Sequence, residues 1–182
     1  MLSNLHITKD WTLFLDRDGV INHEKKEDYI RNWSEFKFYT ESLAAFPLLA
    51  QKFDRIIITT NQKGIGKGLM TATDLDLIHQ NMKKHIIELG GRIDAIFYCA
   101  DLDNLSINRK PQPGMAFQAK EKFPSIDFTK SIMVGNRMSD MEFGRNAGMH
   151  TVYIATTHPE ARFPDTKIDY RYDNLLQFAQ AL

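Results

Sequence analysis

Cysteine and net charge are both scarce in this 182-residue sequence. The single cysteine, Cys99, excludes an internal disulfide and, taken alone, a metal cluster held by several cysteines, so we expect a buried thiol. Lysine plus arginine and aspartate plus glutamate balance at 23 each. This balance indicates neither a basic field for nucleic acid nor an acidic tail, so attraction of a charged ligand must come from local groups.

Long hydrophobic runs, internal repeats and low-complexity tracts are also missing. No apolar run approaches a membrane span, and residues 1–10 lack the apolar core of a secretory signal. Hydrophobic residues make up 43% and charged residues 25%, which is ordinary globular composition. We therefore expect a single domain over residues 1–182, in a cytoplasmic monomer with no membrane or nucleic-acid partner.

Short apolar segments alternate with amphipathic segments along the chain. We expect strands at residues 11–15, 55–60, 93–99, 131–135, 151–155 and, at an edge of the sheet, 168–172. We expect helices at residues 41–53, 71–91, 114–123, 138–148 and 173–181. The alternation predicts a three-layer, Rossmann-like α/β domain with a mainly parallel central sheet.

Two of the expected helices carry an apolar stripe that should face the core. In helix 41–53 the stripe consists of Leu43, Ala44, Phe46, Leu48 and Leu49. In helix 71–91 it consists of Leu75, Ile78, Met82, Ile86 and Leu89. His79 and His85 lack the spacing of a metal-binding pair on that face, so we predict solvated or partly packed histidines without a role.

Two carboxylates, Asp16 and Asp18, follow the first expected strand directly. Residues two apart on an extended chain point the same way, so both can share one site, and Gly19 then lets the chain turn. Paired acids suit a hard cation such as Mg²⁺, and in phosphate chemistry one acid can attack phosphorus while the other transfers a proton. Taken alone, the pattern also fits a solvated turn or a calcium-type loop.

The second and third expected strands are also followed by polar groups. Thr60 and Asn61 precede a glycine-rich turn, which would suit phosphate although it does not match the P-loop pattern. Arg109 and Lys110 stand before a proline-rich turn, where they would either bind a phosphate or be simply solvated.

Four motifs, in order, resemble those of the haloacid-dehalogenase-like phosphatases, in particular the branch of histidinol-phosphate and heptose-bisphosphate phosphatases. They are Phe-Leu-Asp-Arg-Asp-Gly-Val-Ile-Asn from Phe14, Thr-Asn-Gln from Thr60, Arg-Lys-Pro-Gln-Pro-Gly-Met from Arg109, and Gly-Asn-x-x-x-Asp from Gly135. The resemblance covers nearly the whole chain. It implies this family's fold without a large cap domain, and hydrolysis of a small phosphorylated metabolite with Mg²⁺ as cofactor.

The resemblance also implies roles for the residues of the first three motifs. Asp16 would be the nucleophile that becomes phosphorylated, and Asp18 the general acid and base. Thr60, with Asn61 adjacent, would hold the transferring phosphoryl group. Lys110 would stabilise the phosphate, and Arg109 would contact substrate.

The fourth motif departs from the family pattern, Gly-Asp-x-x-x-Asp. Its first acid usually ligates Mg²⁺, and here that position is Asn136, which offers a neutral oxygen and a weaker site. The candidate metal ligands are Asp16, Asp18, Asn136 and Asp140. Three interpretations stay open: a working enzyme with a weakened metal site, ligation shifted toward Asp140, or a protein that has lost catalysis and only binds a phosphate ligand. The first is favoured because the other motif residues are retained.

The loop at residues 100–108 departs from the branch as well. Many relatives bind zinc there through Cys-x-His and a later Cys-x-Cys, whereas this chain keeps Cys99 but has Asp101, Ser106 and Asn108 at the other positions. One thiolate without histidine makes a zinc site unexpected. Because this loop shapes the pocket of relatives, its change weakens the transfer of their substrate identity to this chain. Heptose bisphosphate is the first choice, then histidinol phosphate or another sugar phosphate.

Residues 22–38 are polar, mixed in charge and dotted with aromatic side chains, without a helical or strand period. They predict a long loop beside the site. Its aromatic residues, Tyr29 among them, either pack beneath the loop or contact substrate, and the sequence leaves both open.

The nucleophile assignment predicts the behaviour of Asp16→Asn. We expect Mg²⁺-dependent phosphate release to fall by several orders of magnitude, because an amide oxygen is a poor nucleophile. Phosphate release by purified wild type and variant measures this. Equal release by both would show that Asp16 is not the nucleophile.

Overall fold

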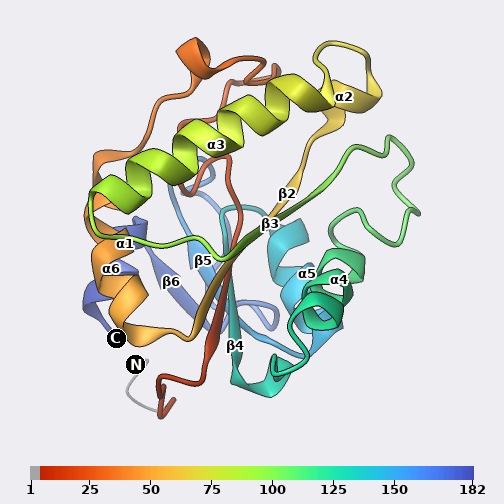
Figure 1. Cartoon of the computed structure of the whole chain (residues 1–182). Coiled ribbons are helices and arrows are strands. Elements are labelled where there is room, and N and C mark those ends of the chain that lie inside the picture. Colours follow the sequence, from red (N-terminus) through yellow and green to blue (C-terminus); the bar gives the residue numbers. More distant parts are fainter. Residues whose placement is uncertain (1–4) are drawn as a thin grey trace.

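A computed structural model describes residues 5–182. Residues 1–4, part of the 1–10 segment in which no secretory signal is expected, lie outside this range. Its centre is one six-stranded, wholly parallel sheet with the order β3-β2-β1-β4-β5-β6 (Figure 1). The strands are β1 (Thr12–Leu15), β2 (Arg55–Asn61), β3 (Ala95–Cys99), β4 (Ser131–Gly135), β5 (His150–Ile154) and β6 (Tyr170–Tyr172). All six expected strands are confirmed, and the last lies at an edge.

Helices cover both faces of the sheet. They are α1 (Thr40–Lys52), α2 (Lys63–Gly66), α3 (Ala72–Glu88), α4 (Gly114–Lys122), α5 (Met138–Ala147) and α6 (Leu175–Gln180). The α1, α3 and α6 helices pack on one face and α4 and α5 on the other (Figure 1). The three-layer α/β architecture is therefore confirmed, without a large cap among the described residues.

The alternation of side chains along β1 shows why both faces need helices. Leu13 and Leu15 join the core cluster under α1, α3 and α6, whereas Phe14 joins the cluster under α4 and α5. All three side chains are fully buried. A strand that is apolar on both sides can be stable only between two helical layers, as parallel strands commonly are.

The predicted helix stripes are correct in part. Phe46 and Leu49 are buried in α1, but Ala44 and Leu48 are exposed, and Ala45 and Ser42 are buried instead. The buried hydroxyl of Ser42 is satisfied because it donates a hydrogen bond to the Val20 carbonyl at 2.6 Å.

The α3 stripe differs from the prediction at its end and at one polar position. Leu75, Ile78, Met82 and Ile86 are buried as expected. Leu89 is 47% exposed because it follows the last turn of the helix. His79 was predicted to be solvated or partly packed, but it is buried.

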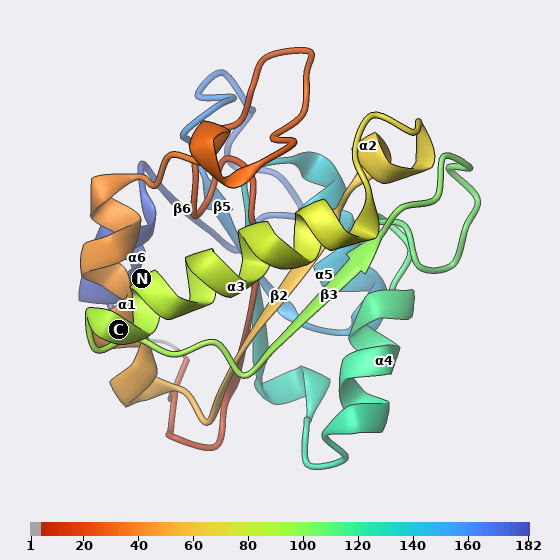
Figure 2. The ribbon, with the colours of Figure 1, turned by 45° about the horizontal axis from the view of Figure 1, so that its top comes forward.

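The strand order reverses at β1, which pairs with β2 on one side and with β4 on the other. Chains leaving such strands diverge and open a crevice at the carboxyl ends. Residues 22–38, α2 and the loop at residues 100–108 lie around this end of the sheet (Figures 1 and 2). Within residues 5–182, none of the helices has the length and apolar character needed to cross a membrane.

Phe46 is expected to contribute strongly to the stability of the α1 face, since its side chain is fully buried. We predict that Phe46→Ala lowers the free energy of unfolding by about 3–5 kcal/mol, through lost burial and the cavity left behind. Urea denaturation measures this. The matched control is Phe117→Ala, because Phe117 is 48% exposed, and it should change stability by less than about 1 kcal/mol. Similar losses in both variants would contradict the assigned core.

Candidate active site

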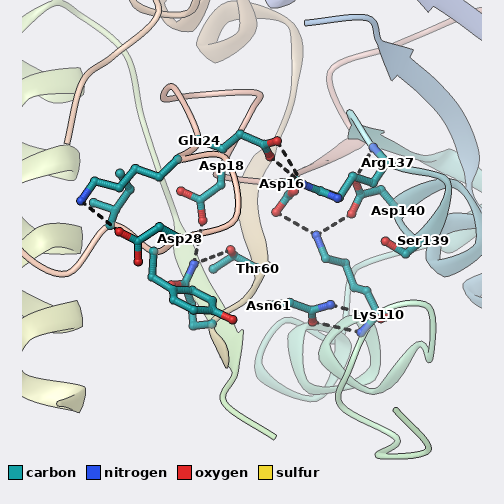
Figure 3. A pocket seen from close by; sticks show the side chains of 14 residues that line it. Asp16, Asp18, Glu24, Asp28, Thr60, Asn61, Lys110, Arg137, Ser139 and Asp140 are labelled. Atoms are coloured by element: carbon teal, nitrogen blue, oxygen red, sulfur yellow. Dashed lines mark hydrogen bonds and ion pairs between the residues drawn. The ribbon is translucent and has the colours of Figure 1, made fainter. Parts of the chain in front are cut away.

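Side chains from the segments that follow β1, β2, β3 and β4, together with the 22–38 loop, surround a cavity of about 150 Å³ at the carboxyl edge of the sheet (Figure 3). The lining residues are Asp16, Asp18, Glu24, Lys25, Asp28, Tyr29, Ile30, Thr60, Asn61, Gln62, Lys110, Arg137, Ser139 and Asp140. The structure therefore brings together six of the eight residues predicted for the site. The other two, Arg109 and Asn136, lie outside this inner cavity.

A buried ammonium group lies between two carboxylates at the base of the cavity. The Nζ atom of Lys110 is 2.8 Å from Asp16 Oδ1 and 2.7 Å from Asp140 Oδ1, and it also donates to the Thr59 carbonyl at 2.8 Å (Figure 3). All three charged side chains are at least nine-tenths buried. Asp16 Oδ1 also accepts from the Arg17 backbone N–H at 2.8 Å. With Oδ1 held by two donors, Oδ2 remains available to a ligand.

The buried charges shift the proton affinity of both partners. Burial raises the pKa of Asp16 to about 7, with Lys110 working against the rise and the carboxylates of Asp140 and Asp18 adding to it. Burial works to lower the pKa of Lys110, but Asp140 and Asp16 outweigh it and the net shift is upward. Lys110 is therefore a firmly held cation.

Asp18 lies in a different environment, although it is only two residues from Asp16. Arg17 Nη2 donates to Oδ1 at 2.9 Å and to Oδ2 at 2.8 Å, Asn22 Nδ2 donates to Oδ1 at 2.9 Å, and Gln62 Nε2 donates to Oδ2 at 3.0 Å. Burial works to raise the pKa of Asp18, but these donors outweigh it and the net shift is downward. Asp18 is thus held as a carboxylate.

The polar groups after β2 are used in two ways. Thr60 is buried, and its hydroxyl accepts a hydrogen bond from Gln62 Nε2 at 2.9 Å. Asn61 exchanges two 3.1 Å hydrogen bonds with the backbone of Lys110, one in each direction. Asn61 therefore ties the end of β2 to the segment that carries the lysine.

Arg109 lines a second, more open cavity of about 680 Å³ that adjoins the first. Its side chain donates to Asn104 Oδ1 at 3.2 Å and to the Asp101 carbonyl at 3.3 Å. The charged residues lining this outer cavity are six cations, Lys25, Lys63, Lys67, Arg109, Lys110 and Arg137, and two acids, Glu27 and Asp28. Lys110, Arg137 and Lys25 are paired with carboxylates outside this group, which leaves Lys63, Lys67 and Arg109 to favour an anionic group there.

Asn136 lines neither cavity. Its side chain is buried, with Nδ2 donating to the Thr157 hydroxyl at 2.6 Å and Oδ1 lacking a hydrogen-bond partner among the described residues. The amide packs so closely on Gly19 that a Cβ atom there would lie 2.0 Å from Nδ2. Gly19 also has φ +84°, a backbone conformation that glycine adopts readily.

Several lining residues were not predicted. Nη2 of Arg137 donates to both carboxylate oxygens of Glu24 at 3.0 Å, and this ion pair links the 22–38 loop to the start of α5 (Figure 3). Gln62 was visible in the second motif and Arg137 in the fourth, but their local sequence does not reveal what they contact. Only the fold brings Glu24 beside a residue 113 positions later.

The 100–108 loop is held by hydrogen bonds at two of the positions where the resemblance would place zinc ligands. The Ser106 hydroxyl donates to the Asp101 carboxylate, and Asn108 Oδ1 accepts from Gln118 Nε2 at 3.0 Å. Cys99 is a free, buried thiol, as predicted. Among residues 5–182, no three His, Cys, Asp or Glu side chains are grouped so that they could hold a metal ion.

Comparisons with known proteins agree with this geometry. Residues 12–179 match the family described as polynucleotide kinase 3 phosphatase. The chain is 33% identical over 173 residues to D-glycero-alpha-D-manno-heptose-1,7-bisphosphate 7-phosphatase of Mycobacterium bovis, covering 94% of this chain and 91% of the relative. The crystal structure of D,D-heptose 1,7-bisphosphate phosphatase from B. bronchiseptica, complexed with magnesium and phosphate, is 26% identical with a TM-score of 0.85, covering 94% of this chain and 97% of that one. The chain therefore belongs to the polynucleotide kinase 3 phosphatase family, within the haloacid-dehalogenase-like phosphatases.

Proposed function

We propose that this chain is a Mg²⁺-dependent phosphatase that releases phosphate from a heptose bisphosphate through an aspartyl-phosphate intermediate. The observation that carries the proposal is Asp16 held by the buried Lys110 at the base of a cavity that opens into a second cavity rich in cations. The named activity of the relatives, which the chain matches over nearly its whole length, supports the same reaction.

The two aspartates divide the chemistry. In the first step Asp16 attacks phosphorus, the bond from phosphorus to the leaving oxygen breaks, and Asp18 gives that oxygen a proton. In the second, Asp18 takes a proton from water, which attacks the aspartyl phosphate and restores the Asp16 carboxylate. Asp18 must carry a proton before the first step, and its lowered pKa in the ligand-free site opposes this. An anionic phosphoryl group beside it would raise that pKa by like-charge repulsion, and donation to the leaving oxygen then leaves the carboxylate that the second step needs.

The phosphoryl group needs donors and positive charge around its oxygens in the transition state. Lys110 supplies a fixed charge beside Asp16, and the Thr60 hydroxyl lies in the same cavity. Arg109 reaches only the outer cavity, so we assign it to a remote part of the substrate rather than to the transferring group.

The residues present fit Mg²⁺. Among the described residues, Oδ1 of Asn136 is buried without a hydrogen-bond partner and its amide packs against Gly19, the residue that follows Asp18 in the sequence. Asp16 offers a carboxylate oxygen, Oδ2, that is not used by Lys110 or by the Arg17 N–H. We propose that Asp16, Asn136 and the Asp18 region hold the ion. Asp140 is engaged by Lys110 and by the Arg137 backbone N–H at 3.0 Å, which favours a supporting role for it. When bound, Mg²⁺ would neutralise charge on the transferring phosphoryl group.

The outer cavity favours a substrate with two phosphates. Lys63, Lys67 and Arg109 form no ion pair among the described residues, so their charges would attract a second phosphate. Histidinol phosphate carries an ammonium group that the same three cations would repel. Another sugar phosphate remains the alternative within the enzyme class. A small phosphorylated metabolite is thus the proposed partner, acted on by a cytoplasmic monomer.

The competing class is a phosphate-binding protein that has lost catalysis. It is supported by Asn136, which stands where the family pattern has an aspartate. Such a protein would be stabilised by a phosphorylated ligand without turning it over. The two classes differ in whether phosphate is released.

A substrate panel separates these possibilities. We expect wild type to release phosphate from heptose bisphosphate faster than from monophosphates or histidinol phosphate. We expect Asn136→Asp to lower the Mg²⁺ concentration for half-maximal rate about tenfold, about 1.4 kcal/mol, because a carboxylate replaces a neutral oxygen. Phosphate release by Asn136→Asp but not by wild type would identify a former phosphatase that has lost its activity. If neither protein releases phosphate from any substrate of the panel, the phosphatase assignment is rejected.

The buried lysine should matter for both stability and rate. Lys110→Met leaves two buried carboxylates without their cation, so we predict a loss of about 3–5 kcal/mol in the free energy of unfolding, together with loss of phosphate release. Lys84→Met is the matched control, since Lys84 is 75% exposed and should change neither. Denaturant unfolding and phosphate release measure the two effects. A stable and active Lys110→Met would contradict the central charge arrangement.

A further inference from the structure

Arg17 is the largest fully buried side chain of the described residues, and it lies behind Asp18 rather than in the lining of either cavity. Its Nη2 and Nε atoms are both directed at the Asp18 carboxylate, Nη2 at 2.8–2.9 Å and Nε at 3.2 Å. The remaining nitrogen, Nη1, is 3.2 Å from Nε2 of His79. Arg17 therefore connects Asp18 to α3, a helix that contributes no residue to either cavity.

The chemistry of the two groups determines the direction of this contact. A guanidinium group can only donate, so Nε2 of His79 must be the acceptor and Nδ1 must carry the ring proton. His79 is 7% exposed. Burial lowers the pKa of His79 to about 3, and the charge of Arg17 adds to the effect, so the ring is neutral at pH 7.

We propose that His79 is a positioning residue that aims the Arg17 guanidinium, and through it the Asp18 carboxylate. This inference rests on the proposed function, in which Asp18 transfers the proton. An acceptor on Nη1 fixes the guanidinium plane, and a planar fork that bonds both carboxylate oxygens fixes the carboxylate in turn.

A neutral acceptor suits this task better than the alternatives. A second carboxylate at position 79 would share the charge of Arg17 and weaken its hold on Asp18. An apolar side chain would leave Nη1 buried without a partner, which is costly and would draw the guanidinium toward another acceptor. Imidazole satisfies the donor and leaves the full charge to Asp18.

Kinetics of three histidine variants test the inference. His79→Leu keeps the apolar packing but removes the acceptor, so we expect kcat to fall about 10- to 100-fold, because a small misalignment of a reacting group has effects of this size. KM should stay within about twofold, since the residue does not reach the substrate cavities. His79→Gln restores a neutral acceptor and should recover most of the rate.

His85→Leu is the matched control, because His85 lies on the same helix with its side chain 49% exposed. It should keep wild-type kinetics. The inference is overturned if His79→Leu keeps the wild-type kcat, or if the leucine and glutamine variants lose activity equally. Combining His79→Leu with Arg17→Lys adds a second check, because effects that pass through Arg17 are not additive. Additive losses would place the action of His79 elsewhere.

A readout without turnover separates this inference from the proposed function. We expect the ¹³C resonance of the Asp18 carboxyl to shift in His79→Leu and to stay in place in His79→Gln and His85→Leu. If wild type releases no phosphate but the resonance behaves in this way, the proposed function fails and the positioning role stands. An unmoved Asp18 resonance in His79→Leu would reject the role whatever the enzyme's activity.

Discussion

The buried ammonium group of Lys110 is the interaction on which the site depends. It lies between the carboxylates of Asp16 and Asp140, with almost no solvent to screen any of the three charges. Two acids and one base leave a net negative charge at the base of the cavity. Such an imbalance is costly in a buried site unless a cation offsets it. Burial is the main cause of the raised pKa of Asp16, and the neighbouring carboxylates of Asp140 and Asp18 add to it. A site of this charge is suited to a divalent cation together with an anionic ligand.

The second aspartate is controlled by a separate set of contacts. Asp18 accepts from Arg17, Asn22 and Gln62, which come from the strand end, the following loop and the end of β2. Two carboxylates two residues apart therefore have opposite pKa shifts. Separating the proton affinities of neighbouring acids in this way is how one site assigns them different tasks.

Charged residues around the site can also contact parts of a ligand other than the transferring phosphoryl group. The Glu24–Arg137 pair joins the 22–38 loop to α5, and the outer cavity beyond it has a cationic lining. The chain as a whole carries no net charge, so this lining is a local concentration of positive charge. Local concentration gives attraction for an anion without making the whole surface basic.

The pattern of apolar and polar residues was enough to predict the sheet and most helices, and the motifs were enough to predict the grouping of Asp16, Asp18, Thr60 and Lys110. Apolar runs mark strands buried on both faces, and residues that follow parallel strands share one edge of the sheet. Three features could be seen only in the folded chain: Arg17 lies buried behind Asp18, Asn136 turns toward Thr157, and His79 is buried instead of solvated or partly packed. Each of these outcomes depends on a partner at least 21 positions away or on the depth at which the side chain is buried. The spacing of apolar residues along the chain reveals neither the distant partner of a side chain nor how deeply that side chain is buried.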